Sequence, residues 1–236
     1  MFDSVVRQQI ENFLLEKVSD DFSIWRCYNW CYDAYDSLGE EDYSDVVFLC
    51  QANRYENGVT KIVLFYDDLP DWVIKIPILG NYIEEIDEYC DFSCSGTGSG
   101  NDYCLTEKEY TFDAINYGLG SCFINTYYVC EINGVKFYCS PKIDKVYHDV
   151  FHYGDKKIYS KPDSFNQAKN LEYCCENECY LDIEDLAFFI DAYGEAVAEK
   201  LIQFLYDWDI RDLHHGNLGF DKQGNIKIID CSGWRD

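Results

Sequence analysis

Three polar residues near the end of the chain, Asp212, Asn217 and Asp230, limit its possible folds more than any other feature. Asn217 follows Asp212 by five residues within Ile210–Asp221, and Asp230 comes thirteen residues later, after the apolar run Ile226-Lys227-Ile228-Ile229. An Asp, an Asn and a second Asp that closes a strand can bring three oxygen ligands into one small volume. This layout suits orienting a hydroxyl and holding magnesium on a nucleotide's phosphates.

A lysine lies in the middle of an earlier apolar strand. In Trp72-Val73-Ile74-Lys75-Ile76-Pro77, Lys75 alternates with Ile74 and Ile76. Because successive side chains of a strand point to opposite faces, Lys75 should face either solvent or a ligand.

The hydrophobic pattern predicts the order of the secondary-structure elements. Residues 2–18 have the spacing of an amphipathic helix. We then expect strands over 45–50, 61–66 and 72–77, with Asn57-Gly58 as a hairpin signal between the first two. The remaining expected elements are a helix over about 102–117, strands over 123–132 and 135–139 around Asn133-Gly134, an irregular region with short helices over 141–180, and helical structure over 181–208.

These motifs resemble those of protein-kinase-like phosphotransferases. Asp-Leu-His-His-Gly-Asn, at 212–217, is most similar to the Asp-Leu-His-x-x-Asn loop of aminoglycoside and choline kinases, and Trp-Val-Ile-Lys is similar to the Val-Ala-Ile-Lys of the third kinase strand. The resemblance implies an α+β, protein-kinase-like fold. It would have a five-stranded antiparallel N-lobe sheet with one helix, and a reduced, mainly helical C-lobe.

The resemblance also implies roles for individual residues. Lys75 would hold the α- and β-phosphates of ATP, and Glu107 of Leu-Thr-Glu-Lys would orient it, with Glu109 as the other candidate. Asp212 would accept or orient the proton of the attacking hydroxyl, while Asn217 and Asp230 would bind Mg²⁺.

The chain also departs from the kinase pattern. The expected phosphate-covering loop, residues 51–60, has only Gly58 where kinases use three glycines, and Cys231 replaces the Phe of Asp-Phe-Gly. The sequence ends six residues after Asp230, so we expect a truncated substrate lobe. The expected domains are an N-terminal helical extension over 1–43, a kinase-like N-lobe over 44–140, and a truncated C-lobe over 141–236.

The composition narrows the classes of partner. A formal net charge of −25 disfavours direct contact with nucleic acid and with anionic membranes, because such contacts need Lys and Arg. No signal peptide or long apolar run is visible, so we expect a cytoplasmic protein. The 13 cysteines are an odd number in a long chain without an export signal, so we expect reduced thiols, most of them small buried hydrophobic groups. The clusters 90–104 and 174–179 lack the paired spacing of a zinc site.

Two functional hypotheses follow from the sequence. The first is a minimal ATP- and Mg²⁺-dependent phosphotransferase, in which the five residues Lys75, Glu107, Asp212, Asn217 and Asp230 handle the nucleotide and metal. The second is a catalytically weak or inactive kinase-like protein that uses its acidic surface, as phage-type inhibitors do, to dock on a basic, nucleic-acid-binding partner.

Overall fold

The chain forms two compact units. One comprises Met1–Lys108 and Thr126–Lys142, and the other Glu109–Asn125 and Ile143–Asp236. The computed structural model describes residues 2–22, 44–57, 61–77, 102–143, 145–146, 162–174, 180–211 and 213–231.

A five-stranded antiparallel sheet is the centre of the first unit, in the order β1-β2-β3-β5-β4. The strands are β1 (Arg54–Asn57), β2 (Lys61–Phe65), β3 (Trp72–Pro77), β4 (Tyr127–Ile132) and β5 (Val135–Pro141). Together with the helices, this sheet confirms the expected α+β fold and the five antiparallel strands.

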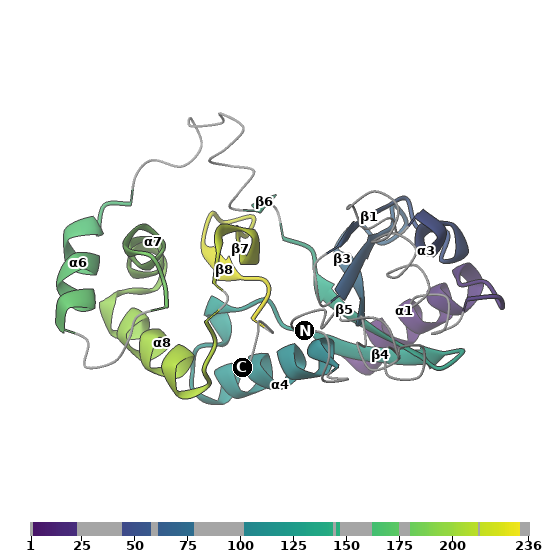
Figure 1. Ribbon diagram of the computed structural model, residues 1–236, viewed down its shortest axis with the longest axis horizontal. Coiled ribbons are helices and arrows are strands. Elements are labelled where there is room, and N and C mark those ends of the chain that lie inside the picture. Colours follow the sequence, from purple (N-terminus) through teal and green to yellow (C-terminus); the bar gives the residue numbers. More distant parts are fainter. Residues whose placement is uncertain are drawn as a thin grey trace, which may run out of the picture. The chain divides into compact units, whose positions relative to one another are not determined.

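One face of this sheet is apolar and packs against α1 (Ser4–Lys17). Ile62 of β2 and Ile74 of β3 both point to this face. They share a core with Ile10 and Leu14 of α1, and all four side chains are almost completely buried. Figure 1 shows α1 running beside β4 and β5. The N-terminal helix is therefore part of the same hydrophobic core as the sheet.

The strand expected over 45–50 is wrong, because this segment forms the helix α3 (Ser44–Leu49). Val46, Leu49 and Cys50 are buried in the sheet core, and their i, i+3, i+4 spacing is that of one helix face. The Tyr66 hydroxyl donates a hydrogen bond of 2.9 Å to the Cys50 carbonyl, just beyond the helix end. The periodicity of a short apolar run is compatible with a strand or with a helix. In this segment, packing against the rest of the unit favours the helix.

The first strand, β1, instead lies within the segment that was expected to form the phosphate-covering loop. β1 pairs with β2 from Arg54 opposite Phe65 to Asn57 opposite Ile62. Its side chains alternate across a regular antiparallel ladder, so Arg54–Asn57 within residues 51–60 is strand. Gly58 lies outside the described residues.

The helix after β3 is α4 (Tyr103–Asn116), which confirms the helix expected over about 102–117. A short 3₁₀ turn, η2 (Gly120–Cys122), follows it. The strand expected over 123–132 begins only at Tyr127, because Phe123 instead makes an isolated parallel bridge to Ile228. This bridge belongs to the second unit, so the chain changes unit before β4 starts.

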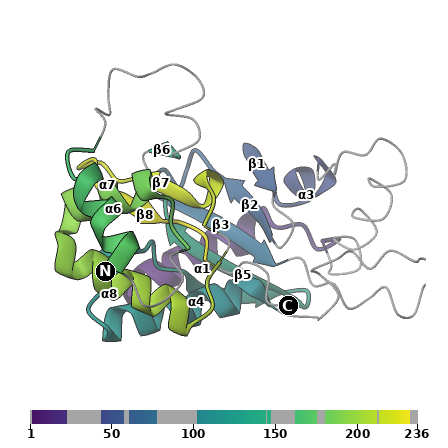
Figure 2. The same ribbon diagram turned by 60° about the vertical axis from the view of Figure 1, so that its left-hand side comes forward.

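The second unit is built mainly from helices. α6 (Phe165–Cys174), α7 (Ile183–Tyr193) and α8 (Glu195–Asp207) lie side by side in Figures 1 and 2. Leu186 and Phe189 of α7 and Leu201 and Phe204 of α8 are buried in one core. Within the described parts of the chain, none of the helices is long and apolar enough to cross a membrane.

The helical region expected over 181–208 is divided at Gly194. Its φ of 87° and ψ of 157° end α7 and start α8, and this region of backbone space is open almost only to glycine. The Gly194 amide still donates to the Ile190 carbonyl at 2.7 Å, which closes the last turn of α7.

A small antiparallel sheet follows α8. It has the order β6-β7-β8, with β6 (Lys145–Val146), β7 (Leu218–Phe220) and β8 (Ile226–Ile228). The 3₁₀ turn η3 (His215–Asn217) leads directly into β7. The expected apolar strand before Asp230 is therefore present.

Six of the cysteines are buried: Cys50, Cys104, Cys122, Cys130, Cys139 and Cys231. Burial raises the pKa of Cys139 to about 12 and the pKa of Cys122 and Cys130 to about 11. At neutral pH these three thiols stay protonated and pack as small hydrophobic groups.

We predict that Gly194→Ala destabilises the protein. An added Cβ would meet no atom within 4 Å, so the cost is backbone strain alone, about 1–3 kcal/mol. Denaturant unfolding measures this cost, with Glu195→Ala at the next, exposed position as the control. Equal stability of the two variants would show that the α7–α8 junction tolerates other backbone conformations.

Candidate functional site

The second face of the five-stranded sheet carries two buried lysines. Lys75 on β3 lies opposite Val63 on β2 and Tyr138 on β5, and Lys61 is two residues before Val63. The period of two along a strand places these four side chains on one face, here called the lysine face. Lys61 is 2% exposed and Lys75 is 5% exposed. Lys75 was expected to face solvent or a ligand; it is withdrawn from solvent and lies against Glu107.

Glu107 of α4 joins the two lysines. One carboxylate oxygen, Oε1, accepts from the Lys75 ammonium, and the other, Oε2, accepts from the Lys61 ammonium. Glu107 has no exposed surface, whereas Glu109, the other candidate, is exposed. The structure thus pairs Lys75 with Glu107, in a cluster with a second lysine that the sequence patterns did not single out.

Two hydroxyl groups complete the cluster. Thr126 donates to Glu107 Oε1 and lies 3.3 Å from the Lys75 ammonium. The Ser140 and Thr126 hydroxyl oxygens are 2.8 Å apart. All of these groups are buried, and the shared hydrogen bonds offset part of the desolvation cost of holding charges away from water.

Asp102 fixes the start of α4 relative to the sheet. Its Oδ1 accepts from the Leu105 amide at 3.0 Å, while its Oδ2 accepts from the Tyr138 hydroxyl and from Lys136. Burial, followed by the hydrogen bond to Asp102, raises the pKa of Tyr138 well above its usual range, so the hydroxyl remains a donor. This connection holds α4 with Glu107 directed at the lysine face.

Asn217 and Asp230 come together in the second unit through their backbones. The Asn217 carbonyl accepts from the Ile229 amide at 2.8 Å and lies 3.4 Å from the Asp230 amide. Just before Asn217, the Gly216 amide donates to His214 Nδ1 at 2.9 Å. A Cβ at Gly216 would lie 2.7 Å from the His214 ring, so a larger residue there would have to displace this ring from its hydrogen bond. Asp212 lies outside the described residues.

The turn between β7 and β8 sets the position of β8, the strand that precedes Asp230. Asp221 Oδ1 accepts from the Gln223 and Asn225 amides, each at 2.9 Å, and Lys227 lies 3.2 Å from Oδ2. Burial opposes ionisation of Asp221, but the hydrogen bonds from Asn225 and Lys227 outweigh it and lower the pKa of the carboxyl. The turn is therefore held by an ionised aspartate.

The donor set at Asn217 and Asp230 fits Mg²⁺. Magnesium keeps several waters and is usually bound by one or two protein oxygens together with substrate phosphates. The Asn217 side chain has an amide oxygen and the Asp230 side chain has a carboxylate, and the backbones of the two residues are neighbours. These two groups meet this need. Among the described residues, no three His, Cys, Asp or Glu side chains gather into a group that could hold a metal by themselves.

Sequence reasoning did not find Lys61, Thr126 or Ser140. Lys61 begins an apolar strand, as many solvent-facing lysines do, and only the pairing of β2 with β3 places it beside Lys75. Thr126 precedes β4 and Ser140 lies in β5, far from Glu107 in sequence. The alternation of side chains in β2 is a weak signal for Lys61, because it assigns the lysine to the face opposite Ile62.

No protein-family model matches the chain, and no curated protein sequence matches it. Among solved structures, it is similar to the bifunctional kinase-methyltransferase WbdD, with 11% identity, a TM-score of 0.39, and coverage of 77% of this chain and 33% of that one. It is also similar to APH(2″)-IIa in a ternary complex with streptomycin and ATP, with 13% identity, a TM-score of 0.28, and coverage of 83% and 71%. The chain thus spans about a third of the first structure. Both TM-scores are below 0.5, so a function can be argued only from the chain's own residues.

We predict that Glu107→Gln destabilises the protein more than either Lys61→Met or Lys75→Met. Loss of the carboxylate leaves two buried ammonium groups side by side, at a cost of about 3–5 kcal/mol. Loss of one lysine leaves the other paired with Glu107, and we expect a cost of about 1–3 kcal/mol. Denaturant unfolding of the three variants gives the order. A Lys75→Met variant as unstable as Glu107→Gln would mean that Lys61 does not share the carboxylate.

We also predict that Asp221 makes stability depend on pH. Its pKa is lower in the folded protein, so its contribution is present above the ordinary aspartate pKa of about 3.9 and is lost as pH falls through the folded value. At pH 7, Asp221→Asn should be less stable than wild type by about 1 kcal/mol. Urea unfolding from pH 7 to pH 3 should show this difference shrinking. Glu199→Gln, a change at an exposed site on α8, controls for the loss of one charge.

Proposed function

We propose that this protein is a minimal ATP- and Mg²⁺-dependent phosphotransferase with a kinase-like site. The observation that carries the proposal is the buried pairing of Lys75, on the central strand β3, with Glu107 of α4. An ion pair costs desolvation energy when it is buried and adds little net stability compared with apolar packing. Its presence in the middle of a sheet is better explained by a need to hold an ammonium group in place.

The lysine face provides the positive charge that a nucleotide's phosphates require. Lys75 is the candidate for contacting the α- and β-phosphates, with Glu107 and Thr126 setting its position. Lys61 adds a second ammonium next to it. In a protein with a net charge of −25, such local cations are needed to offset the repulsion of a polyanionic ligand.

Asn217 and Asp230 are the candidates for holding Mg²⁺. When bound there, the metal would neutralise charge on the phosphate oxygens. The Asn217 carbonyl keeps its own position through the Ile229 and Asp230 amides. The candidate ligands are the side-chain oxygens of Asn217 and Asp230. Asp212, five residues before Asn217, is the candidate for orienting the attacking hydroxyl and taking its proton.

A nucleotide-dependent thermal shift tests the proposal. With Mg²⁺ and ATP at about 100 times Kd, binding adds about 2.7 kcal/mol, which is a rise in Tm of roughly 5–10 °C for a chain of this size. We expect the rise to need both Mg²⁺ and ATP, to be lost in Asp230→Asn, and to persist in the control Glu199→Gln. Release of the γ-phosphate should be lost in Asp212→Asn, while its thermal shift remains.

The acidic composition favours a second candidate function. A net charge of −25 suits a kinase-like protein without turnover that docks on a basic, nucleic-acid-binding partner. Absence of any thermal shift at millimolar ATP would contradict the phosphotransferase. Association with a basic protein that weakens as salt rises would then support the second candidate.

A further inference from the structure

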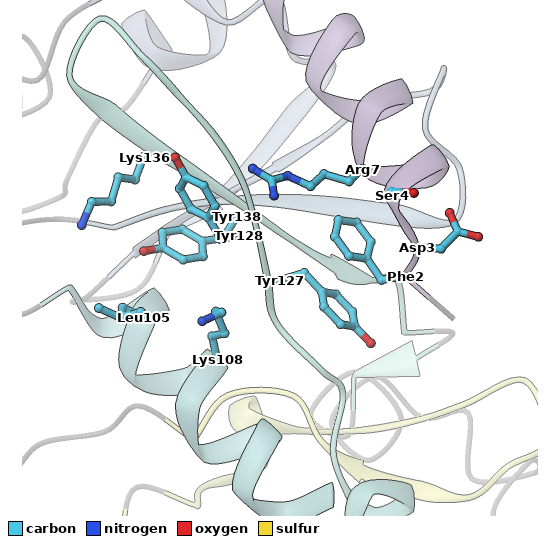
Figure 3. A pocket seen from close by; sticks show the side chains of 10 residues that line it. All are labelled: Phe2, Asp3, Ser4, Arg7, Leu105, Lys108, Tyr127, Tyr128, Lys136 and Tyr138. Atoms are coloured by element: carbon cyan, nitrogen blue, oxygen red, sulfur yellow. The ribbon is translucent and has the colours of Figure 1, made fainter.

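The first unit contains a pocket that neither proposed function uses. It has a volume of about 620 Å³ and lies where the start of α1, the first turns of α4 and the strands β4 and β5 meet (Figure 3). This volume is within the usual range of about 300–1,000 Å³ for small-molecule sites. Lys61, Lys75 and Glu107 are not among the described residues that line it.

The lining of this pocket is basic, although the protein is strongly acidic. Three cationic residues, Arg7, Lys108 and Lys136, line it, and Asp3 is the one carboxylate among its described lining residues. The whole chain has 44 acidic and 19 basic residues, so the local ratio is reversed. Asp3 caps α1 by accepting from the Val5 and Val6 amides at 2.9 Å, and in Figure 3 its carboxylate points away from Arg7. The charge of the pocket therefore favours an anion.

Arg7 is held in a defined position. Its Nε donates to the Val129 carbonyl at 2.9 Å, and its guanidinium carbon lies 5.3 Å from the centre of the Tyr128 ring. Figure 3 shows the side chain reaching from α1 toward Tyr128 and Tyr138. Its terminal Nη groups have no hydrogen-bond acceptor among the described residues. A guanidinium fixed in this way is prepared to donate paired hydrogen bonds to a phosphate or carboxylate.

Aromatic rings form the rest of the wall. Phe2 and Tyr127 stack with ring centres 4.4 Å apart, and Tyr128 meets Tyr138 edge to face at 5.6 Å. Leu105, from the first turn of α4, adds an aliphatic surface that is partly exposed. Flat apolar walls next to fixed cations suit a ligand with an aromatic ring and one anionic group.

We propose that this pocket binds a small aromatic anion, either an aryl phosphate or an aryl carboxylate. Its anionic group is bound by Arg7 and Lys108, and its ring packs against Tyr128. Lys136 also lines the pocket, but its charge is largely balanced by Asp102, with which it is paired at 3.3 Å. The proposal stands on this unit alone and does not depend on ATP binding.

Calorimetric titration of the full chain with phenyl phosphate and with benzoate, without nucleotide or Mg²⁺, tests this site. We expect saturable binding with a Kd of about 0.1–1 mM, in keeping with ligands of this size. The tighter of the two ligands identifies the anionic group. Benzyl alcohol, which has the ring without the charge, and inorganic phosphate, which has the charge without the ring, should each bind at least roughly tenfold more weakly.

Substitutions of the lining residues test whether the ligand binds in this pocket. Arg7→Gln and Lys108→Gln should each weaken the tighter ligand by roughly tenfold or more, whereas Arg7→Lys should retain part of the affinity. Lys200→Gln, at an exposed position on α8, should have no effect. Because Arg7 also bonds to β4, the Tm of each variant is measured, and Lys108→Gln provides a second variant that keeps that bond.

Three results would overturn the proposal. The first is an absence of saturable binding up to 10 mM of either ligand, about ten times the weakest expected Kd. The second is binding that neither pocket variant changes. The third is binding of phenyl phosphate that is lost in Lys75→Met and kept in Arg7→Gln, which would assign the anion to the lysine face instead.

Discussion

The first unit depends on one carboxylate, Glu107, held between two buried lysines. Charged groups are rarely placed inside a protein without partners, because each must give up its water. Here β2, β3, β5 and α4 each contribute to one cluster, and Thr126, just before β4, completes it. The packing of α4 on the sheet and the positions of the lysines are therefore coupled, and neither can shift without leaving a buried charge unsatisfied.

The two faces of the sheet differ in character, since one is apolar and the other carries the charged cluster. The apolar face packs against α1 and α3 around Ile62 and Ile74, and it supplies the hydrophobic burial that stabilises the unit. That stability lets the opposite face carry charged groups whose burial is costly. The alternation of side chains along each strand produces this separation without any additional element.

The helix α4 serves the candidate site and the basic pocket at the same time. Glu107 contacts the lysine face, while the adjacent Lys108 and the earlier Leu105 line the pocket with Arg7. Asp102, at the helix start, links both regions through Tyr138 and Lys136. Neighbouring positions on a helix point about 100° apart, so one short segment reaches two separate environments.

The sequence by itself determined the elements with strong periodicity and the residues with motif spacing. Strand β3, helix α4 and the strand before Asp230 were predicted, and Glu107 was one of two candidates, with Glu109, for the partner of Lys75. Three features depended on the tertiary structure. Ser44–Leu49 is a helix because its buried positions pack in the core of α1 and the sheet. Lys61 joins Glu107 because of the β2–β3 register. Arg7 and Lys108 line one pocket because α1 packs beside β4. The periodicity of hydrophobic residues predicts whether a segment is a helix or a strand. Contacts between segments distant in sequence are determined only when those segments pack together.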